Sequence, residues 1–328
     1  MRSSRFIAAF LLMMLASVSC NHIDLHDPVS SVYLKLNLKL NTDIVPGEDT
    51  GADQNPDMQE KIYGKIPETV RVCFYSTDTQ KLVAEEFLPP EGGFIDIPSG
   101  TYDIIVYSLG TEVTSIGGTE GRGSAYAYTS EMGATVRITT GTEESKAVED
   151  YKVVHEPDHI FAGTKENVNI PVHSENEMIV IDMDLSTLLE TYSFEVKYIA
   201  DAGKIQKADI YITGQSPSKY FWGNRLGNKA CAIYFESVID EKKGNLYTIF
   251  NTFGKFPNMH SDVYINVLVT DMKGSRYQWI YDVTDQFDNP DNVTHEIIIE
   301  DPIVIPEGGD GFTHDVNQWD GEVIYVPL

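Results

Sequence analysis

One stretch of the chain spells the metal-binding motif of a zinc protease. His155, Glu156 and His159 match H-E-x-x-H, in which two histidines one helical turn apart bind zinc and the glutamate activates a bound water. That chemistry needs a continuous helix from the first histidine to the second. Pro157 lies between them, removes a backbone donor and disfavours helix at Glu156. The segment therefore favours a turn between domains over a metal site, and we predict no catalytic residue, metal ion or cofactor.

A second group of residues has the composition of a binding surface. Residues 218–225 read S-K-Y-F-W-G-N-R, with three aromatic and two basic side chains between predicted strands. Aromatic and arginine side chains on loops are frequent in contacts with proteins and glycans. Tyr220, Trp222 and Arg225 are therefore candidate ligand contacts. The alternative is that Tyr220, Phe221 and Trp222 cap a hydrophobic core.

The beginning of the chain has the pattern of an export signal. Arg2 and Arg5 precede a short apolar run over residues 7–15, and small residues then lead to Cys20. This pattern is typical of a signal peptide over residues 1–19. A cysteine directly after small residues resembles a lipobox, although Ser17 stands where leucine is more usual. We expect Cys20 to carry lipid, with residues 20–31 as a tether to the outer membrane; ordinary cleavage with a free Cys20 is the alternative.

Charge and cysteine content narrow the class of protein further. The chain carries 50 acidic against 24 basic residues, a net charge of -26, which opposes binding to nucleic acid and to anionic membranes. Cys73 and Cys231 remain after Cys20 and make no metal-ligand pattern. Burial of both as small apolar residues is the favoured reading, and a disulfide between them is the alternative.

Alternation of apolar and polar residues indicates an all-β chain. Residues 32–40 alternate strictly, as a half-buried strand does. Residues 41–67 and 110–123 are rich in turn-forming residues and are predicted loops. Many short strands divided by turns favour β-sandwiches, and we place an N-terminal domain at 32–160, a C-terminal domain at 161–305 and a tail strand at 306–328. The predicted strands cover residues 70–75, 82–88, 94–97, 102–109, 134–140, 151–155, 159–161, 168–172, 178–185, 192–199, 207–213, 230–237, 246–253, 263–271, 278–283 and 295–300.

Several of these segments together resemble a known family. They are T-V-R-V-C-F-Y at 69–75, I-D-I-P-S-G-T-Y-D-I-I-V-Y at 95–107, T-F-G at 252–254, Y-D-V-T-D-Q at 281–286 and the tail at 311–328. With the lipobox, they resemble the fimbrillin-like lipoproteins of Bacteroides-type bacteria, in a branch catalogued as a domain of unknown function. The resemblance implies two tandem transthyretin-like (Greek-key) β-sandwiches at the cell outer membrane.

The resemblance also implies a mode of assembly. Pilin members of the family lose their first strand after cleavage at an arginine, and the tail of another subunit fills the gap by strand addition. Here the tail would be a donor strand, or else the last strand of its own domain. The apolar tail positions are Val316, Trp319, Val323, Ile324 and Val326.

One departure from the pilin pattern decides between roles. Residues 41–70 contain no arginine, and the first arginine after Cys20 is Arg71, inside a predicted strand. Without that cleavage the chain keeps its first strand. We therefore predict a non-enzymatic, membrane-tethered fimbrillin-like protein in adhesion or fimbrial anchoring and assembly, with fimbrial subunits as partners. A glycan-binding lipoprotein of a polysaccharide-uptake system and a hydrolase with a dispersed site are the alternatives.

Overall fold

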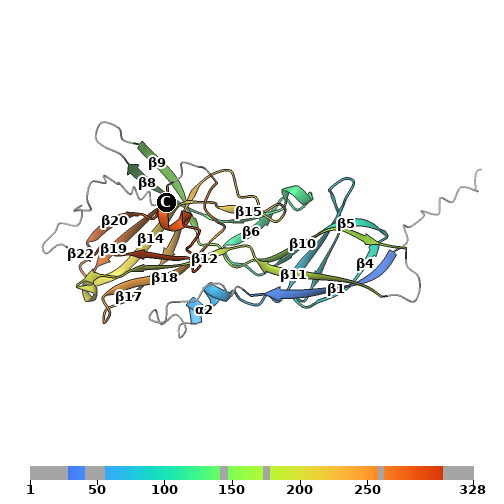
Figure 1. Cartoon of the computed structure of the whole chain (residues 1–328), viewed down its shortest axis with the longest axis horizontal. Helices are drawn as coiled ribbons and strands as arrows, with labels where there is room; N and C mark the ends of the chain where they lie inside the picture. The colour runs from blue at the N-terminus through green and yellow to red at the C-terminus, as the bar shows by residue number, and fades with distance from the viewer. Residues whose placement is uncertain (1–28, 41–55, 141–146, 173–177, 258–261, 306–328) are drawn as a thin grey trace, which may run out of the picture.

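The computed structural model describes residues 29–40, 56–140, 147–172, 178–257 and 262–305. These residues form an all-β molecule, as predicted, with two β-rich units arranged end to end along its long axis (Figure 1). Within the described ranges, no helix is long or apolar enough to cross a membrane. The predicted signal peptide, Cys20 and the tail at 306–328 lie outside the described residues.

The first unit is built on one seven-stranded sheet. Its strand order is β3-β2-β5-β10-β11-β1-β4, and β1 pairs with β11 in parallel and with β4 antiparallel. The strands are β1 (Val29–Lys39), β2 (Val70–Ser76), β3 (Leu82–Leu88), β4 (Gly92–Pro98), β5 (Gly100–Ser108), β10 (Phe161–Ile170) and β11 (Ile179–Thr187).

The sheet of the first unit curls around its own hydrophobic core. In β1 the even positions Val32, Leu34 and Leu36 point inward and are 0%, 0% and 6% exposed. They pack with residues from all six other strands, so every strand contributes to one cluster. The edge strands β3 and β4 approach each other, with Leu88 facing Gly93. Period-two alternation therefore fixes which face of each strand is buried.

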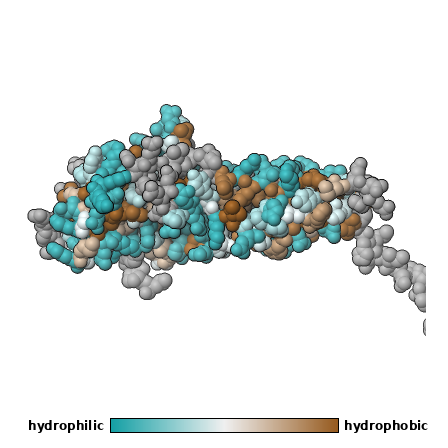
Figure 2. Space-filling model, turned by 90° about the horizontal axis from the view of Figure 1, so that it is seen from below, coloured by the Kyte–Doolittle hydropathy of each residue, from teal (hydrophilic) through white to brown (hydrophobic). Residues whose placement is uncertain are grey.

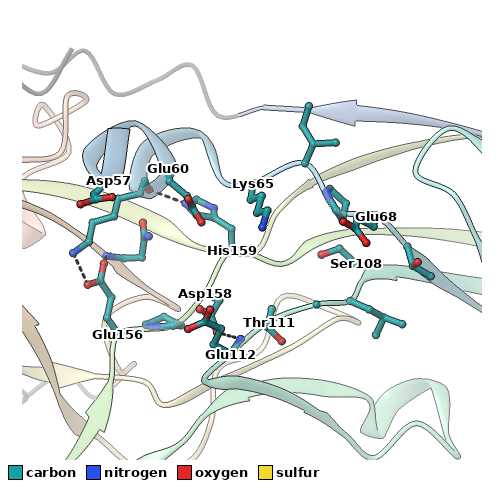
Figure 3. A pocket seen from close by; sticks show the side chains of 18 residues that line it. Asp57, Glu60, Lys65, Glu68, Ser108, Thr111, Glu112, Glu156, Asp158 and His159 are labelled. Atoms are coloured by element: carbon teal, nitrogen blue, oxygen red, sulfur yellow. Dashed lines mark hydrogen bonds and ion pairs between the residues drawn. The ribbon is translucent and has the colours of Figure 1, made fainter. Parts of the chain in front are cut away.

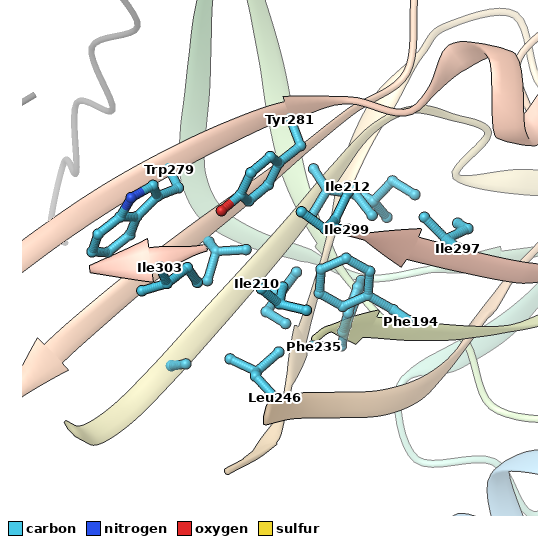
Figure 4. Packing of buried hydrophobic residues seen from close by; sticks show 14 of the residues in the cluster. Phe194, Ile210, Ile212, Phe235, Leu246, Trp279, Tyr281, Ile297, Ile299 and Ile303 are labelled. Atoms are coloured by element: carbon cyan, nitrogen blue, oxygen red, sulfur yellow. The ribbon is translucent and has the colours of Figure 1, made fainter. Parts of the chain in front are cut away.

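The second unit is a sandwich of two main sheets. A six-stranded sheet of order β20-β19-β14-β16-β9-β8 faces a four-stranded sheet of order β17-β18-β12-β21, and β13 pairs with β22. Aromatic and aliphatic side chains from both sheets fill the space between them (Figure 4). The strands are β8 (Glu131–Thr140), β9 (Ala147–His155), β12 (Glu190–Val196), β13 (Ile199–Ala200), β14 (Ile205–Gln215), β16 (Cys231–Glu236), β17 (Val238–Asp240), β18 (Asn245–Thr252), β19 (Tyr264–Asp271), β20 (Arg276–Asp282), β21 (Glu296–Ile299) and β22 (Ile303–Val304).

The division of the chain between the units differs from the predicted boundary at residue 160. Strands β8 and β9 lie before that residue and yet pair in the sheet of the second unit, through β16. Strands β10 and β11 lie after it and pair in the sheet of the first. The chain therefore crosses between the units more than once. Alternation along a sequence reveals that a strand exists but does not identify its partner.

A third sheet joins the two units. It combines β6 (Thr114–Gly117), β7 (Tyr126–Thr129) and β15 (Ser218–Tyr220), and lies over the outer face of the first unit's sheet. Cys73 is buried in the cluster between them, whereas Cys231 is buried in the core of the second unit. Both are free thiols, as the prediction of burial implied.

The predicted loop at 110–123 is not entirely irregular. It contains the strand β6, and a 3-10 turn at Arg122–Ser124 begins at its end.

A short helix replaces part of the other predicted loop. Helix α2 (Pro56–Tyr63) places Met58 and Ile62 on one face, four residues apart, where they pack against Ile249 of β18. It carries Asp57 in its first turn and Lys61 in its last, which suits the helix dipole. Two turns are too few for an apolar stripe to be recognised in the sequence. A further short helix in the described residues, α3 (Thr284–Asp288), is a single turn beside β21.

Candidate functional site

The strongest candidate for a functional element is the first strand. The backbone of β1 is paired on both sides, with β11 from Val32 to Lys39 and with β4 from Val29 to Lys35. Its inward side chains complete the core of the first unit. A strand in this position is the place where β-strand addition would occur if the segment were missing. In this molecule the position is filled by the chain's own residues.

Arg71 is held in a way that protects the neighbouring peptide bonds. It lies in β2, which is paired with β3 on one side and β5 on the other. Its guanidinium forms an ion pair with Glu85 and donates a hydrogen bond of 2.8 Å to the Tyr107 hydroxyl. A protease needs an extended segment that is free of such pairing. Arg71 is therefore a poor site for release of β1.

The H-E-x-x-H segment lies at the junction of the two units and is not helical (Figure 3). It leaves β9 at His155, and residues 156–160 run across a cleft of about 800 Å³ without regular structure. The Glu156 carboxylate accepts hydrogen bonds from Lys61 Nζ at 2.7 Å and from the backbone N–H of Asn251 at 2.9 Å. Burial raises the pKa of Glu156 above its ordinary value. Glu156 thus ties helix α2 to strand β18.

The side chains of Asp158 and His159 in this segment act as further ties. Asp158 Oδ2 accepts the backbone N–H groups of Glu112, Val113 and Thr114, at 2.7 to 3.1 Å. His159 Nε2 lies 2.7 Å from the carbonyl oxygen of Lys61, and its Nδ1 lies 3.0 Å from Thr187 Oγ1. Burial lowers the pKa of His159. Both ring nitrogens are therefore occupied by structural hydrogen bonds.

These contacts leave no arrangement that resembles a metal centre. Among the residues that the structure describes, no group of three or more His, Cys, Asp or Glu side chains is placed to hold an ion. The segment instead joins α2, β18, the 112–114 loop and β11, so it braces the two units. Sequence reasoning predicted the turn but missed Lys61, Asn251 and Thr187, because each is far from the motif in the chain.

We expect zinc to leave the stability of the protein unchanged. A ligand raises the thermal midpoint only if it binds the folded state better than the unfolded state. His159 has no free nitrogen in the fold, so ZnCl2 at about ten times the protein concentration is expected to shift Tm by less than about 1 °C. Differential scanning fluorimetry with and without a chelator measures this. A rise of several degrees would contradict the absence of a site.

The predicted contact residues Tyr220, Trp222 and Arg225 come together beside the third sheet. The Arg225 guanidinium lies 4.3 Å from the centre of the Tyr220 ring and donates to the Gly123 carbonyl at 2.5 Å. The Trp222 ring, half-buried, lies 4.2 Å from the Arg122 guanidinium. These cation–aromatic pairs fix the loop around the 3-10 turn.

Phe221, between these residues, belongs to the core. It is 6% exposed and stacks on Tyr107 with 4.9 Å between ring centres. For Phe221 the structure therefore agrees with the alternative in which this residue caps a hydrophobic core. Arg225 is exposed and Tyr220 half-buried, and a ligand contact at Tyr220, Trp222 and Arg225 stays a prediction. The predicted lipidation site Cys20 and the tail positions lie outside the described residues.

A curated protein is similar to this chain over most of the length of this chain. It is "Putative fimbrium anchoring subunit Fim4B" of Bacteroides ovatus, 27% identical over 250 residues. The match covers 71% of this chain and 65% of that protein, so the chain spans about two thirds of the relative's length.

Two solved structures share the fold. One is a crystal structure from Bacteroides ovatus described as a "putative adhesin", which is 20% identical and covers 89% of this chain and 94% of its own, with a TM-score of 0.57. A second Bacteroides ovatus structure with the same description is 11% identical and covers 94% of this chain and 99% of its own, with a TM-score of 0.51.

A family model also matches the chain directly. It is the model of DUF5119, a domain of unknown function, and it matches residues 59–236. That range is more than half of the 328 residues and includes strands of both units. The chain therefore belongs to the DUF5119 family.

Proposed function

We propose that this protein is a membrane-tethered, non-enzymatic anchoring subunit of a fimbrium, held in the outer membrane by lipid on Cys20. The observation that carries the proposal is the built-in first strand. Because β1 fills the core of the first unit and is paired on both sides, the position of the first strand is not open to another subunit's strand in the described residues. A subunit that donates a strand but accepts none ends a chain of subunits at its base.

The comparisons support this proposal. The 27% identical relative is named as a fimbrium anchoring subunit, and the chain resembles fimbrillin-like lipoproteins in the motifs given above. The apolar tail positions Val316, Trp319, Val323, Ile324 and Val326 would form the strand that enters the first stalk subunit. The partners are thus the outer membrane through Cys20 and a fimbrial subunit through the tail.

The first test is the form of the protein on cells. We expect the mature chain to begin at a lipidated Cys20 and to retain residues 29–39, because the bonds around Arg71 are protected. Mass spectrometry of protein recovered from outer membranes identifies the first residue of the mature chain. The sample is digested beforehand with a protease that does not cut after arginine. Mature protein that starts after residue 71 would refute the proposal.

The second test separates anchoring from membrane residence alone. Cys20→Ala is expected to release the protein together with its fimbriae into the medium, whereas removal of residues 306–328 is expected to release fimbriae and leave the protein on the cell. Proteinase treatment of intact and lysed cells places the units outside or inside the membrane. Digestion only after lysis would remove the anchoring and adhesion role.

A further inference from the structure

A row of exposed apolar side chains crosses the outer face of the first unit. Tyr33 in β1 is the direct partner of Phe94 in β4 and of Val180 in β11. The Tyr33 and Phe94 rings lie edge to face, 5.0 Å apart. Phe94 and Val180 are 64% and 49% exposed, and Met178, on the same face as Val180, is 65% exposed.

Val29 extends this row to the end of the unit. It is the first residue of β1, lies on the same face as Tyr33 and is 55% exposed. We call Val29, Tyr33, Phe94, Met178 and Val180 the tip patch. In the space-filling view, apolar atoms toward the free end of the first unit are mixed with polar ones, and a larger apolar area lies near the middle of the molecule (Figure 2). Single exposed apolar residues are ordinary, but Tyr33, Phe94 and Val180 are direct neighbours across three strands, and such a group indicates a contact surface.

The surroundings of the tip patch are polar and locally paired. Asp96, exposed, pairs with Ser31 between Val29 and Tyr33. On the side toward the second unit the patch ends at an ion pair of 3.1 Å between Lys35 and Asp182. An exposed polar pair thus separates Val29 from the rest of the patch, and an ion pair that remains hydrated ends the patch toward the second unit.

The short distance along the chain from Cys20 to Val29 indicates which partner the tip patch would face. Val29 is nine residues after Cys20, and nine extended residues span at most about 30 Å. The second unit lies at the other end of the molecule (Figure 1). Lipid attached to Cys20 would therefore keep a bilayer within reach of the tip patch, which lies on strands of the first unit.

We propose that the tip patch rests in the interface of the lipid bilayer to which Cys20 is tethered, so that the first unit supplies the contact with lipid. This inference rests on the lipid tether of the proposed function. Aromatic rings with an apolar body suit the level of the lipid headgroups, where Tyr33 keeps its hydroxyl hydrated. The net charge of -26 opposes anionic lipid, so the attraction is apolar and insensitive to salt.

The test uses the lipidated full-length chain on vesicles of phosphatidylcholine with brominated acyl chains. Phe94→Trp places a reporter in the patch, and Tyr198→Trp places one at an aromatic residue of the second unit that is 58% exposed. Brominated lipid is expected to reduce the fluorescence added by Phe94→Trp about twofold, because an interfacial residue lies within about 5–10 Å of the acyl boundary. The fluorescence added by Tyr198→Trp is expected to remain unchanged.

The outcomes distinguish failure of the patch from failure of the tether. Vesicle flotation of the wild-type chain reports the tether, and its absence overturns both proposals, since no bilayer is then within reach. Flotation with no quenching, or with equal quenching of both reporters, overturns the patch alone. A fluorescence change of the Phe94→Trp variant that depends on protein concentration without vesicles would assign the patch to a second copy of the chain instead.

Discussion

Leu34→Asp is expected to unfold the first unit. Leu34 is 0% exposed, and the cluster around it is formed by apolar residues of all seven strands. A carboxylate there would have no charged partner, so we expect a loss of at least about 4 kcal/mol in the free energy of unfolding. Its neighbour Lys35 points outward, and its ion pair with Asp182 has both side chains about half exposed. Lys35→Ala is therefore expected to cost less than about 1 kcal/mol.

Urea unfolding followed by near-ultraviolet circular dichroism measures both changes. If Leu34→Asp is not recovered as folded protein, Leu34→Ala gives a milder version, with an expected loss of about 3 kcal/mol. Equal effects at Leu34 and Lys35 would mean that β1 is dispensable for the core. The reason for proposing an anchor that keeps its first strand would then be lost.

The sequence alone predicts this part of the fold well. Residues 32–40 alternate, and β1 (Val29–Lys39) buries Val32, Leu34 and Leu36 as the alternation predicts, whereas Leu38 is half-buried and Leu40 is exposed. The same reasoning could not assign β10 and β11 to the first unit. Their partners β5 and β1 are distant in the chain, and the pairing depends on how the whole sheet closes.

The junction shows the same limit at the level of side chains. Pro157 rules out a zinc-binding helix from the sequence, and residues 156–160 are indeed irregular. The roles of Glu156 and His159 could not be predicted, because both bond to Lys61 on a helix of only two turns. Aromatic composition at 220–222 did not distinguish a core residue from a contact residue, since both uses favour the same side chains.

The ion pair at the junction gives the second large effect, and this effect depends on pH. Lys61 Nζ donates to Glu156 at 2.7 Å and to the Ile249 carbonyl at 3.0 Å, and the Glu156 side chain is 16% exposed. Lys61→Met keeps the aliphatic stem and removes the charge, which leaves a buried carboxylate with the Asn251 N–H as its remaining donor among the bonds described. We expect a loss of about 3 kcal/mol at pH 8.

The sign of the pH dependence follows from the pKa of Glu156. Burial holds it above the ordinary value in the fold, and loss of Lys61 raises it further because the lysine favours the charged form. An acid with a raised pKa in the folded state stabilises the fold while it is protonated, below its unfolded pKa, and that contribution disappears as pH rises through the folded pKa. The cost of Lys61→Met is therefore expected to be small near pH 4.5 and to grow toward pH 8.

Two matched variants identify the cause of that loss. Lys65→Met removes an exposed lysine from the same cleft and is expected to change the free energy of unfolding by less than about 0.5 kcal/mol at either pH. Adding Glu156→Gln to Lys61→Met removes the buried charge and should abolish the growth of the loss with pH. Urea unfolding at several pH values, as the difference from wild type, measures all three variants. A loss that stays constant across this range would assign the role of Lys61 to packing of α2 against β18 rather than to neutralisation of Glu156, since only the charged carboxylate makes the cost depend on pH.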